Sequence, residues 1–171
     1  MKKIVTIMAL LVISTLTFAG KPLQVKKGNL DFLKDDAIAK VEMDYSQTTW
    51  EKDRAYDEFC GEDYEPRVAQ SKEAFIQGFN SKSESLKLTD DDDQVKYTIT
   101  VHVGDLERKM FDIAMFYIRI VGSITVVDNE TGEEVCTIEI DKLKGYSSYV
   151  PDTRLYSCFL TLGQNFAKLK K

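Results

Sequence analysis

The chain has 171 residues, of which 28 are acidic, 23 are basic and one is histidine, so its formal net charge is −5. This length allows one domain of ordinary size, and an apolar fraction of 43% is typical of a globular protein. The acidic balance argues against a nucleic-acid-binding protein, which needs a basic face to meet phosphates, and a single histidine excludes metal sites that need several.

The first 19 residues have the pattern of a secretory signal peptide. Lys2 and Lys3 form a short positive region, and an apolar run over residues 4–16 follows. Small residues at positions 17 and 19 then suit a cleavage site. The run is too short for a membrane anchor, which needs about 20 apolar residues, and no cysteine precedes Cys60, so the attachment site of a lipoprotein is missing. We expect a bacterial protein exported to the periplasm or outside the cell, with no membrane span after cleavage.

Residues 20–36 are rich in lysine and aspartate, and we expect an extended lead-in there. Residues 39–45 then alternate between apolar and charged side chains, which predicts a strand with one buried face. Its apolar residues are Val41, Met43 and Tyr45.

Two helices are predicted next. A short one over Arg54–Cys60 ends at Gly61, and a longer one starts at Pro66, where the missing N–H costs nothing in the first turn. The longer helix ends at Asn80-Ser81, and its apolar stripe is Val68, Phe75, Ile76 and Phe79.

A polar loop over residues 81–94, with four consecutive aspartates at 90–93, leads into three strands. The first covers residues 95–103, and residues 104–115 are ambiguous between a loop and its continuation. Alternation returns over residues 118–126, and a turn at 128–132 leads to a return strand over Val135–Leu143.

The chain closes with a loop that carries tyrosine and serine, from Gly145 to Pro151, and a final helix capped by Asp152 or Thr153. The apolar stripe of this helix is Leu155, Cys158, Phe159, Leu162, Phe166 and Leu169. Gly163 interrupts it and weakens a helix by about 1 kcal/mol relative to alanine.

The order strand, helix, three strands, helix predicts a single α+β domain over residues 37–171. We expect a two-layer sandwich in which a mainly antiparallel sheet of about four strands is covered on one face by two helices, with order β-α-β-β-β-α. The other face of the sheet then meets solvent.

The three cysteines are odd in number, so at least one thiol is free. Cys136 and Cys158 fall on apolar faces, which favours small buried hydrophobic side chains. A bridge between these two cysteines is the alternative, because export permits disulfides.

No motif for catalysis, for a cofactor or for a metal is found. The chain has no C-x-x-C pair, no glycine-rich phosphate loop and no G-x-S-x-G turn around a nucleophile. The aspartates at 90–93 lack the glycine and the terminal glutamate of a calcium loop, so a solvated charged loop is favoured. We therefore predict no cofactor, no metal and no assigned catalytic residue.

A binding surface is predicted on the open face of the sheet and in the loop after it. Its residues are His102, Arg119, Glu139, Tyr146 and Tyr149. Mixed charges suit a polar ligand, and tyrosine offers contact area at low entropic cost. The alternatives are an ordinary solvated face and, for the tyrosines, packing of the rings on the last helix.

Four segments resemble a group of small exported bacterial proteins of unknown function. They are Gly28–Lys34 (GNLDFLK), Val41–Ser46 (VEMDYS), Phe75–Asn80 (FIQGFN) and Ile120–Gly132 (IVGSITVVDNETG). The likeness covers most of the mature chain and implies no catalytic residue. The hairpin and the last helix are also similar, more faintly, to envelope domains of the curli-assembly and TolB N-terminal type, which are interaction modules.

These observations favour a non-enzymatic envelope protein that binds a protein or a polar ligand. A small exported hydrolase that uses His102 or a pair of carboxylates is the first alternative. An extracellular inhibitor or carbohydrate-binding module is the second, and it needs an exposed stripe of Trp50, Tyr146 and Tyr149.

Overall fold

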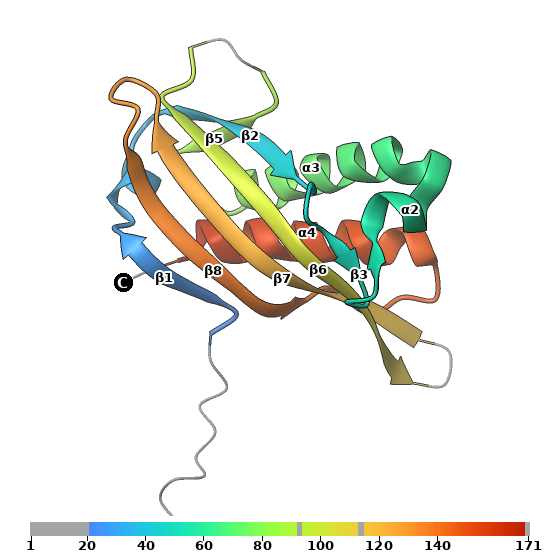
Figure 1. The fold of residues 1–171 in the computed structure, drawn as a ribbon. Helices are drawn as coiled ribbons and strands as arrows, with labels where there is room; N and C mark the ends of the chain where they lie inside the picture. The colour runs from blue at the N-terminus through green and yellow to red at the C-terminus, as the bar shows by residue number, and fades with distance from the viewer. Residues whose placement is uncertain (1–20, 92–93, 113–114, 170–171) are drawn as a thin grey trace, which may run out of the picture.

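The computed structural model describes residues 21–91, 94–112 and 115–169, so the predicted signal peptide lies outside the described residues. One curved sheet forms one layer, and two long helices lie along one of its faces as the second layer (Figure 1). Among the described residues, no helix combines the length and the apolar character that crossing a bilayer requires.

Eight strands and two long helices make up this fold. The strands are β1 (Leu23–Gly28), β2 (Ile38–Asp44), β3 (Thr49–Trp50), β4 (Arg54–Ala55), β5 (Lys87–Thr89), β6 (Tyr97–Asp112), β7 (Met115–Asp128) and β8 (Glu134–Lys144). The long helices are α3 (Tyr64–Asn80) and α4 (Pro151–Ala167). Shorter helical turns are η2 (Asp31–Lys34), α2 (Tyr56–Cys60) and η3 (Gly61–Asp63).

The prediction of a mainly antiparallel sheet of about four strands, with order β-α-β-β-β-α, is wrong. The main path of the sheet runs β1-β8-β7-β6-β2-β5, and β3 and β4 extend it beside β6. The sheet is mixed, because β2 runs parallel to both β5 and β6, and β3 runs parallel to β6. β1 lies in the predicted lead-in and β5 in the predicted polar loop, whereas β4 opens the segment predicted as a short helix and β3 lies just before it. These strands have two to six residues, which are too few to show alternation.

The predicted lead-in is part of the sheet. Its residues Leu23–Gly28 form the edge strand β1, which pairs antiparallel with β8. Leu30, just before η2, and Phe32, within η2, are buried in the core. Charged residues separate these apolar ones, so the sequence pattern does not reveal that this segment belongs to the sheet and the core.

The ambiguous segment continues the strands. β6 runs on to Asp112, and β7 begins at Met115. The ladder between β7 and β8 ends at Arg119, whereas that between β6 and β7 continues to the end of the hairpin. The hairpin therefore projects beyond the neighbouring strands and the helices (Figure 1).

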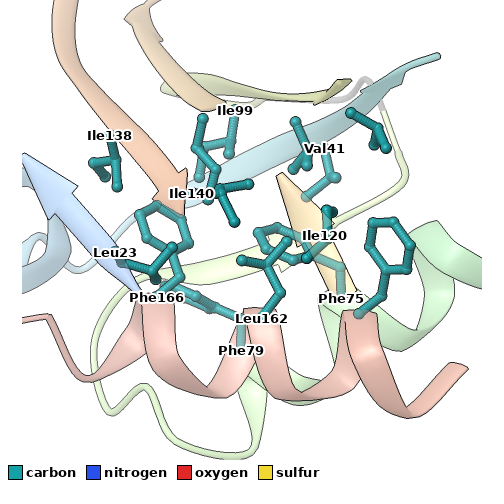
Figure 2. Packing of buried hydrophobic residues seen from close by; sticks show 14 of the residues in the cluster. Leu23, Val41, Phe75, Phe79, Ile99, Ile120, Ile138, Ile140, Leu162 and Phe166 are labelled. Atoms are coloured by element: carbon teal, nitrogen blue, oxygen red, sulfur yellow. The ribbon is translucent and has the colours of Figure 1, made fainter. Parts of the chain in front are cut away.

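The alternating patterns of the longer strands are confirmed by the core. Tyr97, Ile99, Ile124 and Ile138 are all buried in one hydrophobic cluster between the sheet and the helices. In Figure 2 the sheet residues Val41, Ile99 and Ile120 face Phe75, Phe79, Leu162 and Phe166 of the helices. Full burial of such a side chain stabilises the fold by about 1.5–3 kcal/mol.

Glycines set the distance between α3 and α4. A Cβ built at Gly163 would lie 2.2 Å from the carbonyl oxygen of Phe75, and one built at Gly78 would lie 2.1 Å from that of Leu160. Since no side chain fits at these distances, Gly163 marks a close helix contact.

Two local predictions have different outcomes. The turn after β7 is confirmed, with Gly132 at φ +72° and its N–H donating to the carbonyl oxygen of Asp128 at 2.8 Å. The predicted cap of the last helix is wrong, because α4 begins at Pro151 and its N-cap is Val150. A proline is favoured at the first helical position, because its missing N–H is one of those that a helix leaves unpaired at its start.

Candidate functional site

His102 lies in a row of polar side chains across the open face of the sheet. Its Nδ1 is 2.8 Å from Asp44 Oδ2 on β2, and its Nε2 is 3.0 Å from the Thr125 hydroxyl on β7. Hydrogen bonds from Ser46 and from His102 lower the pKa of Asp44 to about 2. A carboxylate, an imidazole and a hydroxyl therefore lie in one hydrogen-bonded line.

This line has the order of groups found in hydrolytic triads, but its surroundings do not favour catalysis. A triad needs a nucleophile beside free N–H donors that stabilise an oxyanion. Thr125 lies in the middle of β7, paired with Thr100 on one side and Thr137 on the other. The backbone around it is committed to the ladders of the sheet.

Arg119 forms an ion pair with Glu107, which sequence reasoning missed. Glu107 is 5% exposed, and Arg119 donates from Nε to its Oε2 at 2.7 Å and from a second guanidinium nitrogen to the same oxygen. The ammonium groups of Lys52 and Lys109 each lie 3.4 Å from a Glu107 oxygen. Burial opposes ionisation of Glu107, but Arg119, Lys52 and Lys109 outweigh it and hold the pKa at about 2.

Glu139 shares a row of the open face with His102. Ser123 faces His102 on one side and Glu139 on the other, so the two predicted residues lie two strands apart. Glu139 forms an ion pair with Lys26, with 2.5 Å between Oε2 and Nζ, and both side chains are nearly half exposed. Such exposed pairs contribute little to stability. The structure therefore separates Arg119 from the other two residues and gives each of the three a partner.

Tyr146 and Tyr149 lie beside the projecting hairpin, on a segment that extends the edge of β7. The N–H of Gly145 donates to the Ile118 carbonyl oxygen at 3.1 Å, and that of Ser148 donates to the Phe116 carbonyl oxygen at 2.9 Å. Both rings are exposed, so the alternative of packing on the last helix is wrong.

Large apolar side chains gather at this end of the molecule. Met110 pairs across the hairpin with Phe116, and Val150 follows Tyr149. We term Met110, Phe116, Tyr146, Tyr149 and Val150 the aromatic tip. Apart from the partly buried Phe116, its members are 54–67% exposed. The other large exposed apolar side chains of the described residues are Val25, on β1, and Ile38, at the start of β2.

Arg154 holds the segment that carries the two tyrosines. It lies on α4, is 8% exposed, and donates from Nε to the Ser148 carbonyl oxygen and from a terminal nitrogen to that of Tyr149, both at 2.8 Å. Its guanidinium carbon lies 5.0 Å from the centroid of the Phe116 ring. An arginine near the start of a helix resembles a surface charge in the sequence, so no local signal marked this role.

Trp50 does not join the tyrosines. It is half-buried and stacks on Phe59, with 4.2 Å between the ring centroids and 7° between the planes. The exposed stripe of Trp50, Tyr146 and Tyr149 that a carbohydrate-binding module needs is therefore not formed.

Three surface grooves lie away from the aromatic tip. The largest, of about 840 Å³, runs between α3 and β5 and is lined by residues that include Val68, Ile76 and Leu88. The others, of about 410 and 610 Å³, lie along β1 and beside η2. The tip residues and His102 line none of the three.

The aspartate run at 90–93 is only partly described. Asp90 pairs with Lys72 of α3, and residues 92 and 93 lie outside the described residues. In the described part of the chain, no group of three or more histidine, cysteine or acidic side chains is placed to hold a metal ion.

Comparison with known proteins finds structural similarity but no family. No protein-family model and no curated protein matches the chain. Two PelC dodecamer structures from Paraburkholderia phytofirmans, one of a single-residue variant, are similar at 10% and 8% identity. They cover 86% of this chain and 98% and 99% of theirs, with TM-scores of 0.48 and 0.49. A neuraminyllactose-binding hemagglutinin homolog from Helicobacter pylori is similar at 8% identity over 89% of this chain and 93% of that chain, with a TM-score of 0.39.

Proposed function

We propose that the protein is an exported, non-enzymatic binding or assembly module that meets its partner through the aromatic tip. The observation that carries this proposal is that four large side chains are each more than half exposed on two segments joined through Phe116 and Ser148, namely Met110, Tyr146, Tyr149 and Val150. Contiguous exposed apolar side chains on a folded protein mark interaction sites. Tyrosine, phenylalanine, methionine and arginine are also the residue types enriched in protein interfaces.

The aromatic tip is held in place before any partner arrives. Arg154 fixes the carbonyl groups of Ser148 and Tyr149, and Phe116 pairs with Ser148 through the backbone. A surface that is already ordered loses less conformational entropy on binding than a mobile loop does. This supports a recognition role for the tip.

The open face of the sheet is a weaker candidate for the binding surface than the aromatic tip. Its polar groups are bonded to one another, as in the pairs of Asp44 with His102 and of Glu107 with Arg119. The aromatic tip is therefore the better candidate for the binding surface.

Photo-crosslinking tests the proposal. A photoreactive residue at position 149 is expected to give a discrete adduct in envelope extract from cells that make the protein. The matched control is the same residue at position 38, because Ile38 is also exposed but lies away from the aromatic tip. Equal labelling from both positions would argue against the tip.

The export part of the proposal rests on the pattern of residues 1–19 and has its own test. The mass of the protein recovered from the periplasm or the medium is expected to lack these residues. Recovery of the intact chain from the cytoplasm alone would contradict export.

A second candidate, a small exported hydrolase, is favoured by the line of Asp44, His102 and Thr125. In this alternative His102 accepts the proton of the Thr125 hydroxyl and Asp44 orients the ring. Turnover of ester or amide substrates that is abolished by both His102→Ala and Thr125→Val would establish it. Turnover unchanged in both variants would eliminate it.

A further inference from the structure

We infer that the aromatic tip docks on the surface of a lipid bilayer with anionic head groups. This inference rests on the proposed function, because it names the partner of the same surface. Shape, side-chain chemistry and charge lead to it separately.

The shape of the aromatic tip fits a broad surface better than a peptide. Beyond Arg119, the segment of Tyr146 and Tyr149 replaces β8 beside β7, and the hairpin projects past the body of the molecule (Figure 1). The tip residues line none of the three grooves described above. Peptides are bound in grooves or along sheet edges, whereas a convex end with exposed apolar side chains can enter the boundary layer of a bilayer.

The side chains of the aromatic tip suit the boundary between head groups and acyl chains. Met110 and Val150 are apolar throughout and gain by leaving water. Tyr146 and Tyr149 combine an apolar ring with a polar hydroxyl, the combination that places aromatic residues at the level of the lipid head groups. These four exposed residues therefore cover both layers of the boundary.

The charge next to the aromatic tip is complementary to an anionic surface. At the base of the hairpin Lys52, Lys109 and Arg119 surround Glu107, and Lys144 faces Arg119 across β7 and β8. With Asp105, Arg108 and the Arg108 partner Glu51 counted beside them, five cations stand against three carboxylates. The whole chain, by contrast, carries a net charge of −5. A positive end on a negative molecule orients that end toward anionic lipid.

Co-sedimentation with vesicles tests the inference. One set of vesicles is phosphatidylcholine alone, and the other contains phosphatidylglycerol as well. The wild type is expected to bind the anionic vesicles and to release as the salt concentration rises. No binding to either set would overturn the inference.

Three variants assign the binding to the aromatic tip. The tip variant, Met110→Ser with Tyr149→Ser and Val150→Ser, is expected to bind anionic vesicles at least about tenfold more weakly. The charge variant, Lys109→Gln with Lys144→Gln, should lose most of the preference for anionic lipid. The control, Val25→Ser with Ile38→Ser, removes exposed apolar side chains elsewhere and should bind like the wild type. All variants are recovered from the same compartment as the wild type, so they agree with it in whether residues 1–19 are present.

The outcomes separate this inference from the proposed function. Equal vesicle binding by the wild type and the tip variant, with unchanged thermal unfolding, would overturn the lipid inference. Sedimentation velocity without lipid gives the oligomeric state. A dimer of the wild type and a monomer of the tip variant would overturn the lipid inference in favour of self-association through the aromatic tip. A protein adduct from position 149 without vesicle binding would overturn it but leave the proposed function standing, and the loss of both would defeat the two together.

Discussion

Arg154 lies over the ring of Phe116, with 5.0 Å between its guanidinium carbon and the ring centroid. The same guanidinium donates to the carbonyl groups of Ser148 and Tyr149. One buried side chain of α4 thereby joins the helix, the loop that precedes it and the projecting hairpin. The exposed tyrosines owe their fixed position to this contact.

Replacement of Arg154 by alanine should therefore destabilise the protein. Two charge-assisted hydrogen bonds and a cation–π contact are lost, and we expect the free energy of unfolding to fall by about 2–3 kcal/mol. Urea unfolding of the variant and of the wild type measures this difference in the free energy of unfolding. The matched control is Arg108→Ala, because Arg108 also lies over the Phe116 ring, at 5.4 Å from its centroid, but is half exposed and pairs with Glu51 at 3.7 Å. Its loss should cost below about 1 kcal/mol. Equal losses in the two variants would contradict the role assigned to Arg154.

The pKa of Glu107, at about 2, makes stability depend on pH. Because the pKa is lower in the folded state than the ordinary value of 4.5, the ionised carboxylate stabilises the fold above about pH 4.5. This contribution is lost as the pH falls toward and through 2. Glu107→Gln removes the group and leaves three cations without their anion, which should lower the stability at neutral pH by about 3 kcal/mol.

Urea unfolding at a series of pH values from neutral to acid checks this expectation. The free energy of unfolding of the wild type should fall more steeply with acid than that of Glu107→Gln. Parallel curves for the two proteins would show that Glu107 does not contribute through its charge.

Gly163→Ala should destabilise the protein, although alanine is the better helix former. Propensity alone favours alanine by about 1 kcal/mol. The new Cβ would stand 2.2 Å from the Phe75 carbonyl oxygen, so α3 and α4 must separate. We expect a net loss of about 1–3 kcal/mol from this overpacking and the same sign for Gly78→Ala. A rise in the thermal midpoint of either variant would refute the close contact.

The thiols should differ in reactivity. All three cysteines are free, with Cys136 and Cys158 buried and Cys60 half-buried. Burial raises the pKa of Cys136 to about 11 and that of Cys158 to about 12. In the native protein we expect a thiol reagent near neutral pH to label Cys60 at least about a hundredfold faster than the other two, since the thiolate is the reactive form. Denaturation without reductant should release all three thiols, and release of one alone would support the alternative bridge between Cys136 and Cys158.

The candidate site was only partly predictable. Tyr146 and Tyr149 were identified from the sequence, whereas Met110 and Glu107 lie in the segment left ambiguous and Phe116 directly follows it. The cause is the irregular register at Gly104, because the ladder shifts between Val103 and Asp105 and the apolar core position moves from odd residues such as Val103 to the even residue Leu106. Beyond the body of the molecule no helix covers the strands, so alternation no longer marks a core.

Periodicity along the chain determined the long strands, the two long helices and the side of each that is buried. It could do so because the free energy of burying an apolar face depends on residues a few positions apart. Only the tertiary structure decided that β2 runs parallel to β6, that β1 and β5 close the edges, and that Arg154 meets Phe116. Those partners lie far apart in the sequence, and their pairing depends on the assembled sheet and helices, which no local pattern records.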